Sequence, residues 1–536
     1  MPTDCISYQN SGYFSNLILD YLEQNPNLKP LYNRFPSLEN LDSQIQEKKE
    51  NYTHENRAIL VSVLKQQYAK ISISKLTDEN IASLLNTNTF TVTTGHQLNL
   101  FTGPLYFLYK IISTINLNQE LKSKYPNNNF VPIYWMATED HDFDEINYFN
   151  FNEKKFRWNT TSSSGAVGRI STDGLAAFFE VYSNELGSSK NAETIKKLFQ
   201  ESYLNHLNLA DATRFLVNAL FGDFGLVILD ADNTDLKRTF IPFIKEELLQ
   251  QTAHKKVLET IQKLSGYPIQ VNPREINLFY LENNLRERIL FDPDSNREEK
   301  YKVNNTAIKF SENEILTLLE NHPEKFSPNV ILRPLYQEVL LPNLCYIGGG
   351  GEIAYWLELK SYFDAVNVTF PSLLLRNSVL LATEKQAAKA EKLELSWKDL
   401  FMKQNDLTNK KTAQLSELPI DFSSQKKQLQ AQFEALYELA KKTDNSFLGA
   451  VKAQETKQIK GLENLEKRLL KAQKRKYSDT LERIVNLQNE LFPNQSLQER
   501  QSNFSEYYLQ NGEYFIPILM KAIKPLDVNF NIILLQ

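Results

Sequence analysis

The sequence predicts an α/β protein with a parallel β-sheet at its core and a helical arm near its C-terminal end. TFTVTTG at 89–95 and NFVPIYWMA at 129–137 are strand candidates, and PLYFLYKIISTINL at 104–117 has helical spacing between them. A strand, a helix and a strand within about 45 residues are typical of a βαβ unit, and hence of parallel strands. From about residue 383 to 491 apolar residues recur seven apart among Lys, Glu and Gln, which favours a coiled coil.

This pattern divides the chain into four parts. Apolar residues at three- and four-residue spacings make 1–85 an N-terminal helical segment, and the core follows over 86–382. Short polar strands, a SSSGAVG turn and two amphipathic helices mark about 146–205 as an insertion into that core. The arm occupies 383–491 and contains TDNS, a candidate turn between two helices. The tail over 492–536 is too apolar for a free end, so we expect it to pack back on the core.

After the insertion, three further segments complete the predicted core. GLVILDAD at 225–232 is a strand candidate that ends in aspartates. NLFYLENNLRERILFD at 277–292 is expected to form a hairpin. PSLLLRNSVLLA at 371–382 is the expected last strand of the core.

Composition excludes several classes of protein. The 60 Lys and Arg against 65 Asp and Glu exclude a strongly basic nucleic-acid coat, so we expect no nucleic-acid partner. Two cysteines, Cys5 and Cys345, exclude a disulfide scaffold and an all-cysteine zinc site, and Cys345 is expected to be a core residue. No apolar run reaches the roughly 18 residues of a membrane span, and the N-terminus lacks signal-peptide features. We therefore expect a soluble, cytoplasmic protein.

The first candidate site is TGHQLNLFTGP at 94–104, between a strand end and a helix start. Ligands of open parallel sheets bind at the carboxyl ends of strands, where helix N-termini also attract anions. His96 and Gln97 in that place could bind a phosphate group or its transition state, with Thr102 and Gly103 in the turn that follows. The alternative is a turn whose histidine caps a helix.

The second candidate is the run Glu139, Asp140, His141 and Asp142, at the end of the next strand. Several carboxylates at the carboxyl end of a strand indicate a cation or an amine ligand. A solvated acidic loop is the alternative. Zinc is disfavoured because thiolate ligands are nearly absent, and the sequence does not decide whether another metal binds.

The third candidate is a glycine run in a glycine-poor chain. Only 17 of 536 residues are glycine, about half the usual ~7%, yet four are adjacent: Gly348, Gly349, Gly350 and Gly351. A strand, a glycine loop and a helix can hold a phosphate or nucleotide, with Glu352 following and Arg333 and Gln337 preceding. The spacing matches neither the P-loop nor the dinucleotide motif, and a tight turn is the alternative. Arg376 and Ser378 in the last core strand are weaker candidates, for which a strand-end cap or an ion pair is preferred.

Five stretches over residues 90–380 together resemble the bacillithiol biosynthesis cysteine-adding enzymes, the BshC family. They are TGHQLNLFTGPLYFLYK, PIYWMATEDHDFDEI, FGLVILDADNTDLK, RPLYQEVLLPNLCYIGGGGEIAYWLELK and PSLLLRNS. Asn99 and Gly350 depart from the family pattern, which has glycine and proline there. The resemblance implies a Rossmann-like core related to class I aminoacyl-tRNA synthetases, a connective insertion, and a C-terminal coiled coil that makes a homodimer.

The resemblance also implies a ligase that joins L-cysteine to the amino group of glucosaminyl-malate, the last step of bacillithiol synthesis. Amide formation from a carboxylate requires activation, which a synthetase-like core would achieve as an aminoacyl-adenylate, with ATP or another nucleotide as co-reactant. The implied catalytic residues are His96, Gln97, Asp140 and His141. The implied substrate-binding residues are Glu139, Asp142, Tyr106, Arg333 and Gln337. The implied nucleotide-binding residues are Thr102, Gly103, Gly348, Gly349, Gly350, Gly351, Glu352, Arg376 and Ser378.

Two other classes of function stay open at this point. A nucleotidyl transferase on the same core would release pyrophosphate without cysteine. A non-enzymatic dimeric binding module, held together by the coiled coil, would keep the ligand pocket without turnover. A purely structural protein would need neither the four adjacent glycines nor the acidic strand end.

Overall fold

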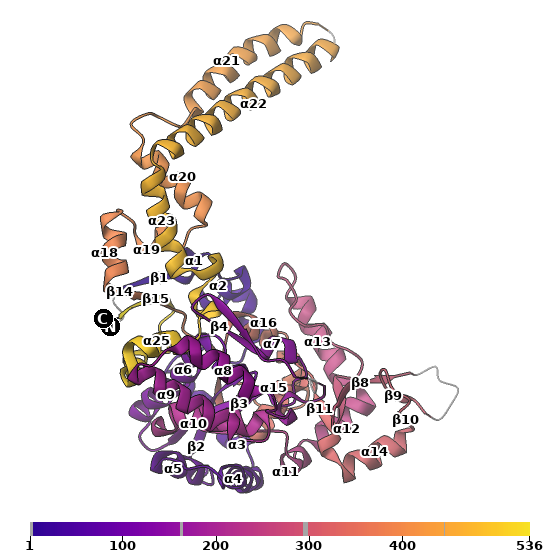
Figure 1. Cartoon of the computed structure of the whole chain (residues 1–536). Helices are drawn as coiled ribbons and strands as arrows, with labels where there is room; N and C mark the ends of the chain where they lie inside the picture. The colour runs from indigo at the N-terminus through magenta and orange to yellow at the C-terminus, as the bar shows by residue number, and fades with distance from the viewer. Residues whose placement is uncertain (1–3, 161–163, 293–298, 444, 536) are drawn as a thin grey trace. The chain divides into compact units, whose positions relative to one another are not determined.

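The computed structural model describes residues 4–160, 164–292, 299–443 and 445–535, which form two compact units (Figure 1). The first unit comprises residues up to 9, 13–380 and 498–533, and the second comprises 10–12, 381–497 and 534 onwards. The SSSGAVG turn expected at 162–168 includes residues 162 and 163, and the expected TDNS turn includes residue 444. These three residues lie outside the described ones.

A parallel β-sheet with the strand order β13-β12-β2-β3-β6 forms the centre of the first unit. Its strands are β2 (Thr89–His96), β3 (Asn129–Met136), β6 (Val227–Asp230), β12 (Asn343–Gly348) and β13 (Ser372–Leu375). All eight residues of β2 are buried, as is typical of a parallel sheet covered on both faces. The predicted strand–helix–strand unit is confirmed as β2, α6 (Tyr106–Lys124) and β3, and GLVILDAD is confirmed as the strand β6.

The carboxyl ends of these strands lie along one edge of the sheet, because neighbouring strands are parallel throughout. His96 ends β2 and pairs with Met136 at the end of β3, which in turn pairs with Asp230 at the end of β6. Gly348 ends β12 and pairs with Leu375 of β13. The loops that follow these strands carry the motifs singled out in the sequence, at the edge where parallel sheets bind ligands.

The hydrophobic core lies between this sheet and helices that include α3 (Asn40–Asn51) and α6. One cluster of buried side chains joins them: Leu41, Ile45, Phe90, Val92, Leu117, Leu121, Phe130, Leu344, Cys345, Ile347 and Leu374. Cys345 is fully buried in this cluster, which confirms that it is a core residue. The other helices before residue 380 are α1 (Tyr8–Ser11), α2 (Asn16–Leu22), α4 (His54–Tyr68), α5 (Lys75–Ser83), α7 (Phe143–Ile146), α8 (Leu175–Leu186), α9 (Lys190–Phe199), α10 (Leu209–Phe221), α11 (Thr234–Arg238), α12 (Ile241–Gln250), α13 (Thr252–Lys263), α14 (Glu312–Asn321), α15 (Leu332–Leu340), α16 (Gly350–Leu357) and α17 (Lys360–Ala365).

A second sheet lies beside α12, α13 and α14 (Figure 1). It is antiparallel, with the order β10-β9-β8-β7-β11, and its strands are β7 (Leu278–Glu282), β8 (Leu285–Phe291), β9 (Tyr301–Val303), β10 (Lys309–Phe310) and β11 (Phe326–Pro328). The predicted hairpin at 277–292 is confirmed as β7 and β8. The other three strands have only two or three residues each, too few for an alternating pattern to identify them. A further hairpin, β4 (Tyr148–Phe151) and β5 (Lys154–Arg157), precedes α8 and α9.

The prediction that 371–382 is one core strand is wrong. β13 is followed by a break at 376–378, and β14 (Val379–Thr383) belongs to a separate sheet with β15 (Asn529–Leu535) and β1 (Asp4–Ser7). The N–H of Val379 donates to Glu499 at 3.1 Å, and the carbonyl of Ser378 accepts from the N–H of Asn531 at 2.9 Å. Glu499 and Asn531 of the C-terminal segment therefore bind the backbone groups at 378–379 that a neighbouring strand of the parallel sheet would otherwise bind. That segment also contains α24 (Gln498–Gln501), α25 (Phe504–Asn511) and α26 (Phe515–Ala522).

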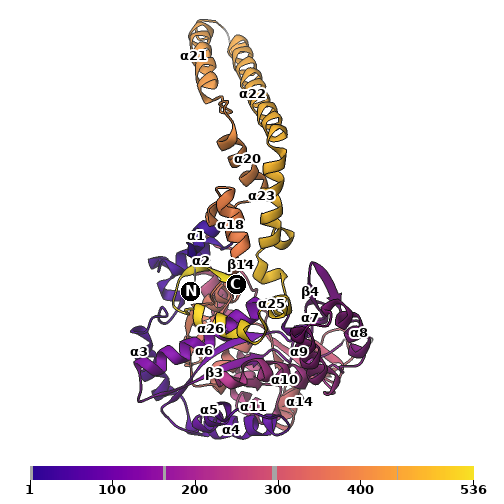
Figure 2. The same cartoon turned by 60° about the vertical axis from the view of Figure 1, so that its left-hand side comes forward.

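The second unit is helical. Its helices are α18 (Glu384–Lys392), α19 (Trp397–Leu400), α20 (Gln404–Leu415), α21 (Ser423–Ala440), α22 (Asn445–Lys476) and α23 (Ser478–Leu491). Helices α21 and α22 lie side by side in both views (Figures 1 and 2). Phe433, Ala440 and Val451 are buried between them, which places the predicted seven-residue pair Phe433/Ala440 on the inner face of this helical hairpin. Within the described ranges, no helix is both long and apolar enough to cross a membrane.

Candidate functional site

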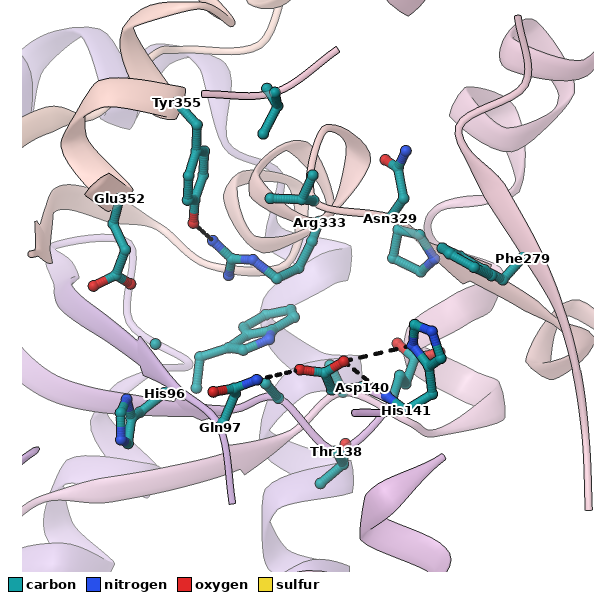
Figure 3. A pocket seen from close by; sticks show the side chains of 18 of the residues that line it. His96, Gln97, Thr138, Asp140, His141, Phe279, Asn329, Arg333, Glu352 and Tyr355 are labelled. Carbon is teal, nitrogen blue, oxygen red and sulfur yellow. Dashed lines mark hydrogen bonds and ion pairs between the residues drawn. The ribbon is translucent and has the colours of Figure 1, made fainter. Parts of the chain in front are cut away.

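A cavity of about 720 Å³ lies at the carboxyl edge of the parallel sheet. Its lining combines the loops after β2 and β3 with residues of α6, α15, α16 and the hairpin β7–β8 (Figure 3). The predicted site residues that line it are His96, Gln97, Tyr106, Glu139, Asp140, His141, Arg333 and Glu352. The predicted site residues outside the lining are Asp142, Gln337, Thr102, Gly103, Gly348, Gly349, Gly350, Gly351, Arg376 and Ser378.

His96 enters the cavity as a neutral imidazole. It ends β2, its ring lies edge-on to Tyr106 with centroids 5.4 Å apart, and its Nε2 has no hydrogen-bond partner among the described residues. Burial, together with the nearby Lys110 ammonium, lowers the pKa of His96 to about 3. The ring therefore offers one hydrogen bond to a bound molecule, but it is a weak base at neutral pH.

The amide of Gln97 has a fixed orientation. Its Nε2 donates to Oδ2 of Asp140 and to Oε2 of Glu145, each at 2.8 Å. Since ionised carboxylates only accept hydrogen bonds, the nitrogen must face them. The amide oxygen consequently faces away from Asp140, on the side where His96 lies (Figure 3). Gln97 thus presents a hydrogen-bond acceptor to the cavity.

Asp140 is held ionised beside Gln97. The backbone N–H of His141 donates to its Oδ1 at 2.7 Å, and the ring of His141 accepts at Nδ1 from Arg286 at 2.7 Å. Burial alone would raise the pKa of Asp140, but hydrogen bonds from His141 and Gln97 and the charge of Arg286 hold it well below its usual range. The cavity therefore keeps a negative charge at this point across the physiological pH range.

The acidic run does not converge on one ligand. Glu139 forms an ion pair with Lys237 at 2.5 Å, and the buried Lys237 also donates to the carbonyl of Phe326 at 2.6 Å. Asp142 is exposed and does not line the cavity. In the part of the chain that the structure describes, no group of three or more His, Cys, Asp and Glu side chains is arranged to hold a metal ion. The carboxylates of this run therefore do not converge on a shared cation site among the described residues.

A partly buried ion pair joins α16, the helix that follows the glycine run, to α6 and to the end of β2. Lys110 of α6 donates to Glu352 of α16 at 2.7 Å and also to the carbonyl of Gly95, while the hydroxyl of Tyr346 donates to Glu352 at 2.6 Å. Burial alone would raise the pKa of Glu352, but Lys110 and the hydrogen bonds to the carboxylate lower it to about 2. Glu352 is therefore ionised and saturated by partners, so that its role is to order the loop.

Arg333 extends across the cavity from the wall opposite Gln97 (Figure 3). It donates to Gln337 at 3.1 Å and to the hydroxyl of Tyr355 at 3.4 Å. Its guanidinium also lies 6.0 Å from the ring centroid of Trp135. Gln337 is fully buried and lies outside the lining, so it positions Arg333 and does not itself face the cavity.

The glycine run lies beside the cavity and not in its lining. A Cβ at residue 348 would lie 2.9 Å from Tyr346 and 3.0 Å from Glu352, so glycine is required there by close packing. The N–H of Gly349 donates to Glu352 at 2.8 Å, and none of the four glycines has a positive φ. The run seats Glu352 at the start of α16.

The other predicted nucleotide residues also lie outside the cavity lining, although Arg376 stacks on the lining residue Tyr106, with its guanidinium 4.9 Å from the ring centroid. Thr102 and Gly103 have φ values of 68° and 61°, and Asn503 of the C-terminal segment donates to the carbonyl of Gly103 at 2.7 Å. Arg376 and Ser378 both donate to Glu499, at 2.7 and 3.3 Å. The Arg376–Glu499 pair is buried, which agrees with the preferred reading of Arg376 as a structural ion pair.

Sequence reasoning missed part of the lining. The missed polar and aromatic residues include Lys110, Arg274, Arg286, Arg288, Tyr346 and Tyr355. The available signal for Lys110 was a single charge within the apolar run LYFLYKII. For Arg286 and Arg288 it was their i, i+2 spacing in the predicted hairpin, which puts both on one face.

Comparison with known proteins identifies the family. Residues 1–377 match the model of the bacillithiol biosynthesis BshC N-terminal Rossmann-like domain, and residues 379–535 match that of the BshC C-terminal coiled-coil domain. A Flavobacterium johnsoniae protein named "Putative cysteine ligase BshC" is 68% identical over 99% of this chain and 100% of its own length. Relatives of the same name from Christiangramia forsetii and Cytophaga hutchinsonii are 58% and 38% identical, over 99% and 98% of this chain and 99% and 97% of their own lengths. The chain therefore belongs to the bacillithiol biosynthesis BshC family and carries both of its domains.

Proposed function

We propose that this cavity joins L-cysteine to the amino group of glucosaminyl-malate, as the last step of bacillithiol synthesis. The family and the ligase name of its relatives support this reaction class. The proposal depends on two opposite sides of the cavity that differ in character. On one side the amide oxygen of Gln97 lies beside the ionised Asp140, and on the other side lies the guanidinium of Arg333. Amide formation needs an amine and a carboxyl group in contact. The side with Gln97 and Asp140 suits the amine, and Arg333 suits the carboxylate.

The chemistry of the site residues favours positioning over proton transfer. The low pKa values of His96 and Asp140 mean that the imidazole is neutral and the carboxylate ionised at neutral pH, so neither has an acidic proton to transfer as a general acid there. Gln97 and Asp140 would orient the N–H groups of the amine, while Arg333 would hold the carboxylate. His96 would add one hydrogen bond from a neutral ring to the charge that develops on the reacting oxygen.

Activation of the carboxylate by ATP or another nucleotide belongs to this proposal, in the manner of a class I aminoacyl-tRNA synthetase. A bound nucleoside triphosphate would supply a leaving group for the carboxylate oxygen. Lys110 and Arg333 line the cavity and suit phosphate charge, whereas the four glycines do not line it. We therefore assign phosphate binding to these cationic side chains and not to the glycine run.

A homodimer formed through the arm is the second part of the proposal. Leu465 of α22 is 53% exposed, and Leu436 and Leu439 of α21 are 40% and 53% exposed, outside the buried interior of the hairpin. Leucines at such positions are stabilised by contact with another helical surface, and a self-complementary stripe forms a two-fold contact easily.

The experiment is a complete reaction with single omissions. Purified protein is incubated with cysteine, glucosaminyl-malate and ATP, and bacillithiol is measured by mass spectrometry. We expect product only in the complete mixture. Product without nucleotide would refute the activation step, and pyrophosphate release without cysteine would favour a nucleotidyl transferase.

A further inference from the structure

One wall of the cavity is lined with arginines. Residues two apart on a strand point to the same face, so Arg286 and Arg288 of β8 both face the cavity. Glu287 lies between them in sequence and turns to the other face, where it accepts from Asn304 at 3.4 Å. Phe279 pairs with Arg288 in the hairpin register, and its ring centroid lies 3.9 Å from the guanidinium of Arg286.

Arg274 extends the same wall just before β7. Its N–H donates to the side chain of Asn277 at 3.1 Å, and its carbonyl accepts from the amide nitrogen of Asn277 at 2.7 Å. Asn277 is in turn bound to the carboxylate of Glu247 at 2.8 Å. The backbone of Arg274 is thereby anchored, and its side chain faces the cavity. Arg274, Arg286 and Arg288 are called the arginine wall below.

The charges of the cavity are not balanced. Its described lining contains five basic side chains, Lys110, Arg274, Arg286, Arg288 and Arg333, against three carboxylates, Glu139, Asp140 and Glu352. Two of those carboxylates form ion pairs, with Lys237 and Lys110. Among the described residues, the arginine wall and Arg333 make no ion pair with any carboxylate.

Arg286 differs from the other two members of the wall in its surroundings. It is largely withdrawn from water, and its described hydrogen-bond partners are all neutral: Ser327, the carbonyl of Pro328 and the ring of His141. The charges of Glu139 and Asp140 offset that of Arg286 without a direct ion pair, whereas Arg274 and Arg288 are exposed and have no carboxylate partner among the described residues. The guanidiniums of Arg274 and Arg288 are therefore open to a bound anion. A planar guanidinium pairs best with the two oxygens of a carboxylate or with a phosphate.

We propose that the arginine wall is the subsite for a dicarboxylate group, the malyl end of the acceptor substrate. This rests on the proposed function, because that reaction requires an acceptor with two carboxylates. Arg333 and Gln97 lie across the cavity from each other and serve the reacting carboxyl and amino groups. The three guanidiniums of the wall then remain for charges distant from the new bond, and they select an acceptor that carries them.

Calorimetric titration without cysteine or nucleotide tests the subsite apart from turnover. The ligands are glucosaminyl-malate, methyl glucosaminide, which lacks the dicarboxylate, and inorganic pyrophosphate. Wild-type protein should bind glucosaminyl-malate more tightly than methyl glucosaminide. The double variant Arg274→Ala/Arg288→Ala should bind glucosaminyl-malate about 10- to 100-fold more weakly, since each charge-assisted hydrogen bond contributes about tenfold or more, and should lose the preference.

Two further variants sharpen the result. Lys309→Ala removes an exposed cation from β10 of the same sheet, outside the cavity, and should leave affinity unchanged. Arg288→Lys keeps the charge without the planar fork and should fall between wild type and the double variant. Unchanged affinity for glucosaminyl-malate in a folded double variant overturns the proposal, as does a loss confined to pyrophosphate. Absence of bacillithiol formation by a wild-type protein that passes this titration would refute the ligase assignment and leave the subsite standing.

Discussion

The amide nitrogen of Gln97 lies 2.8 Å from Oδ2 of Asp140 and also 2.8 Å from the carboxylate of Glu145. This double hydrogen bond fixes which end of the Gln97 side chain faces the cavity. Two carboxylates therefore turn the acceptor oxygen of Gln97 away from them and into the cavity, and one of the two, Glu145, does not itself line the cavity.

Gln97→Glu should reduce kcat/KM by about a hundredfold to a thousandfold, the range found when one directed polar group of a catalytic site is lost. The new carboxylate would face two others and could not keep the orientation of the amide. Steady-state kinetics measures the effect, and an unchanged melting temperature shows that the fold is intact. Full activity in a folded Gln97→Glu protein would remove Gln97 from the site.

Variants of Glu145 test the orientation of Gln97, because Glu145 binds the Gln97 amide but does not line the cavity. Glu145→Ala should lower affinity for the amine substrate about fivefold to tenfold, because one charge-assisted hydrogen bond to Gln97 is lost. Glu145→Gln keeps an acceptor oxygen and should restore most of the affinity. Equal losses in both variants would show that the charge of Glu145, and not its hydrogen bond, is what matters.

The sequence predicted the fold well where segments are long and strongly patterned. β2, α6 and β3 together span 48 residues with buried strands and an apolar helix, so periodicity identified them. The break at Arg376–Ser378 was missed, because the apolar residues on both sides read as one run. Its cause is a set of hydrogen bonds from Glu499 and Asn531, more than a hundred residues away in the chain, and no local pattern records such contacts.

The sequence predicted which residues lie near the site better than it predicted which of them contact one another. Strand ends placed His96, Gln97 and Asp140 at one edge, since parallel strands end together. The sequence could not show that Glu139 binds Lys237, because the two are 98 residues apart. The glycine run in a glycine-poor chain indicated a backbone requirement at Gly348, but the reason is close packing against Tyr346, which depends on the tertiary fold.

Lys110 should be important for stability. Lys110→Met removes the partner of Glu352 and should reduce the free energy of unfolding by about 2 kcal/mol, because a partly buried carboxylate loses its counter-ion. Urea denaturation followed by circular dichroism measures this. Lys75→Met, which breaks the exposed pair with Glu79, is the matched control and should cost less than about 1 kcal/mol. Similar losses in the two variants would contradict the role given to Lys110.

The low pKa of His96 predicts a pH dependence of stability. Between pH 6.5 and 3 the unfolded state binds a proton at His96 that the folded state does not, so stability falls as pH falls from 6.5. Relative to a His96→Gln variant, the wild type should lose about 2 kcal/mol of unfolding free energy between pH 8 and pH 5. Denaturation curves of both proteins at several pH values test this. A difference that stays constant over that range would show that His96 titrates normally.

The arm should hold two subunits together. Replacing Leu465 and Leu469 by Glu should yield soluble monomers with unchanged helix content, because charges placed in an apolar contact lack partners. Lys467→Glu/Lys471→Glu changes exposed charges of the same helix and should leave the mass unchanged. Light scattering decides: one-chain mass for the wild type at micromolar concentration refutes the dimer, and a dimer that survives both leucine substitutions places the interface elsewhere.

The central claim is that cysteine is joined to its acceptor in the cavity between Gln97 and Arg333. The most direct measurement is the rate of bacillithiol formation by Arg333→Met beside wild type and Lys309→Ala, followed by mass spectrometry with all substrates saturating. Arg333→Met should be at least a hundredfold slower, since the side chain that faces the carboxylate loses its charge while Tyr355 and Gln337 keep their places. Lys309→Ala should match wild type. A folded Arg333→Met protein that forms bacillithiol at the wild-type rate would place the reaction outside this cavity.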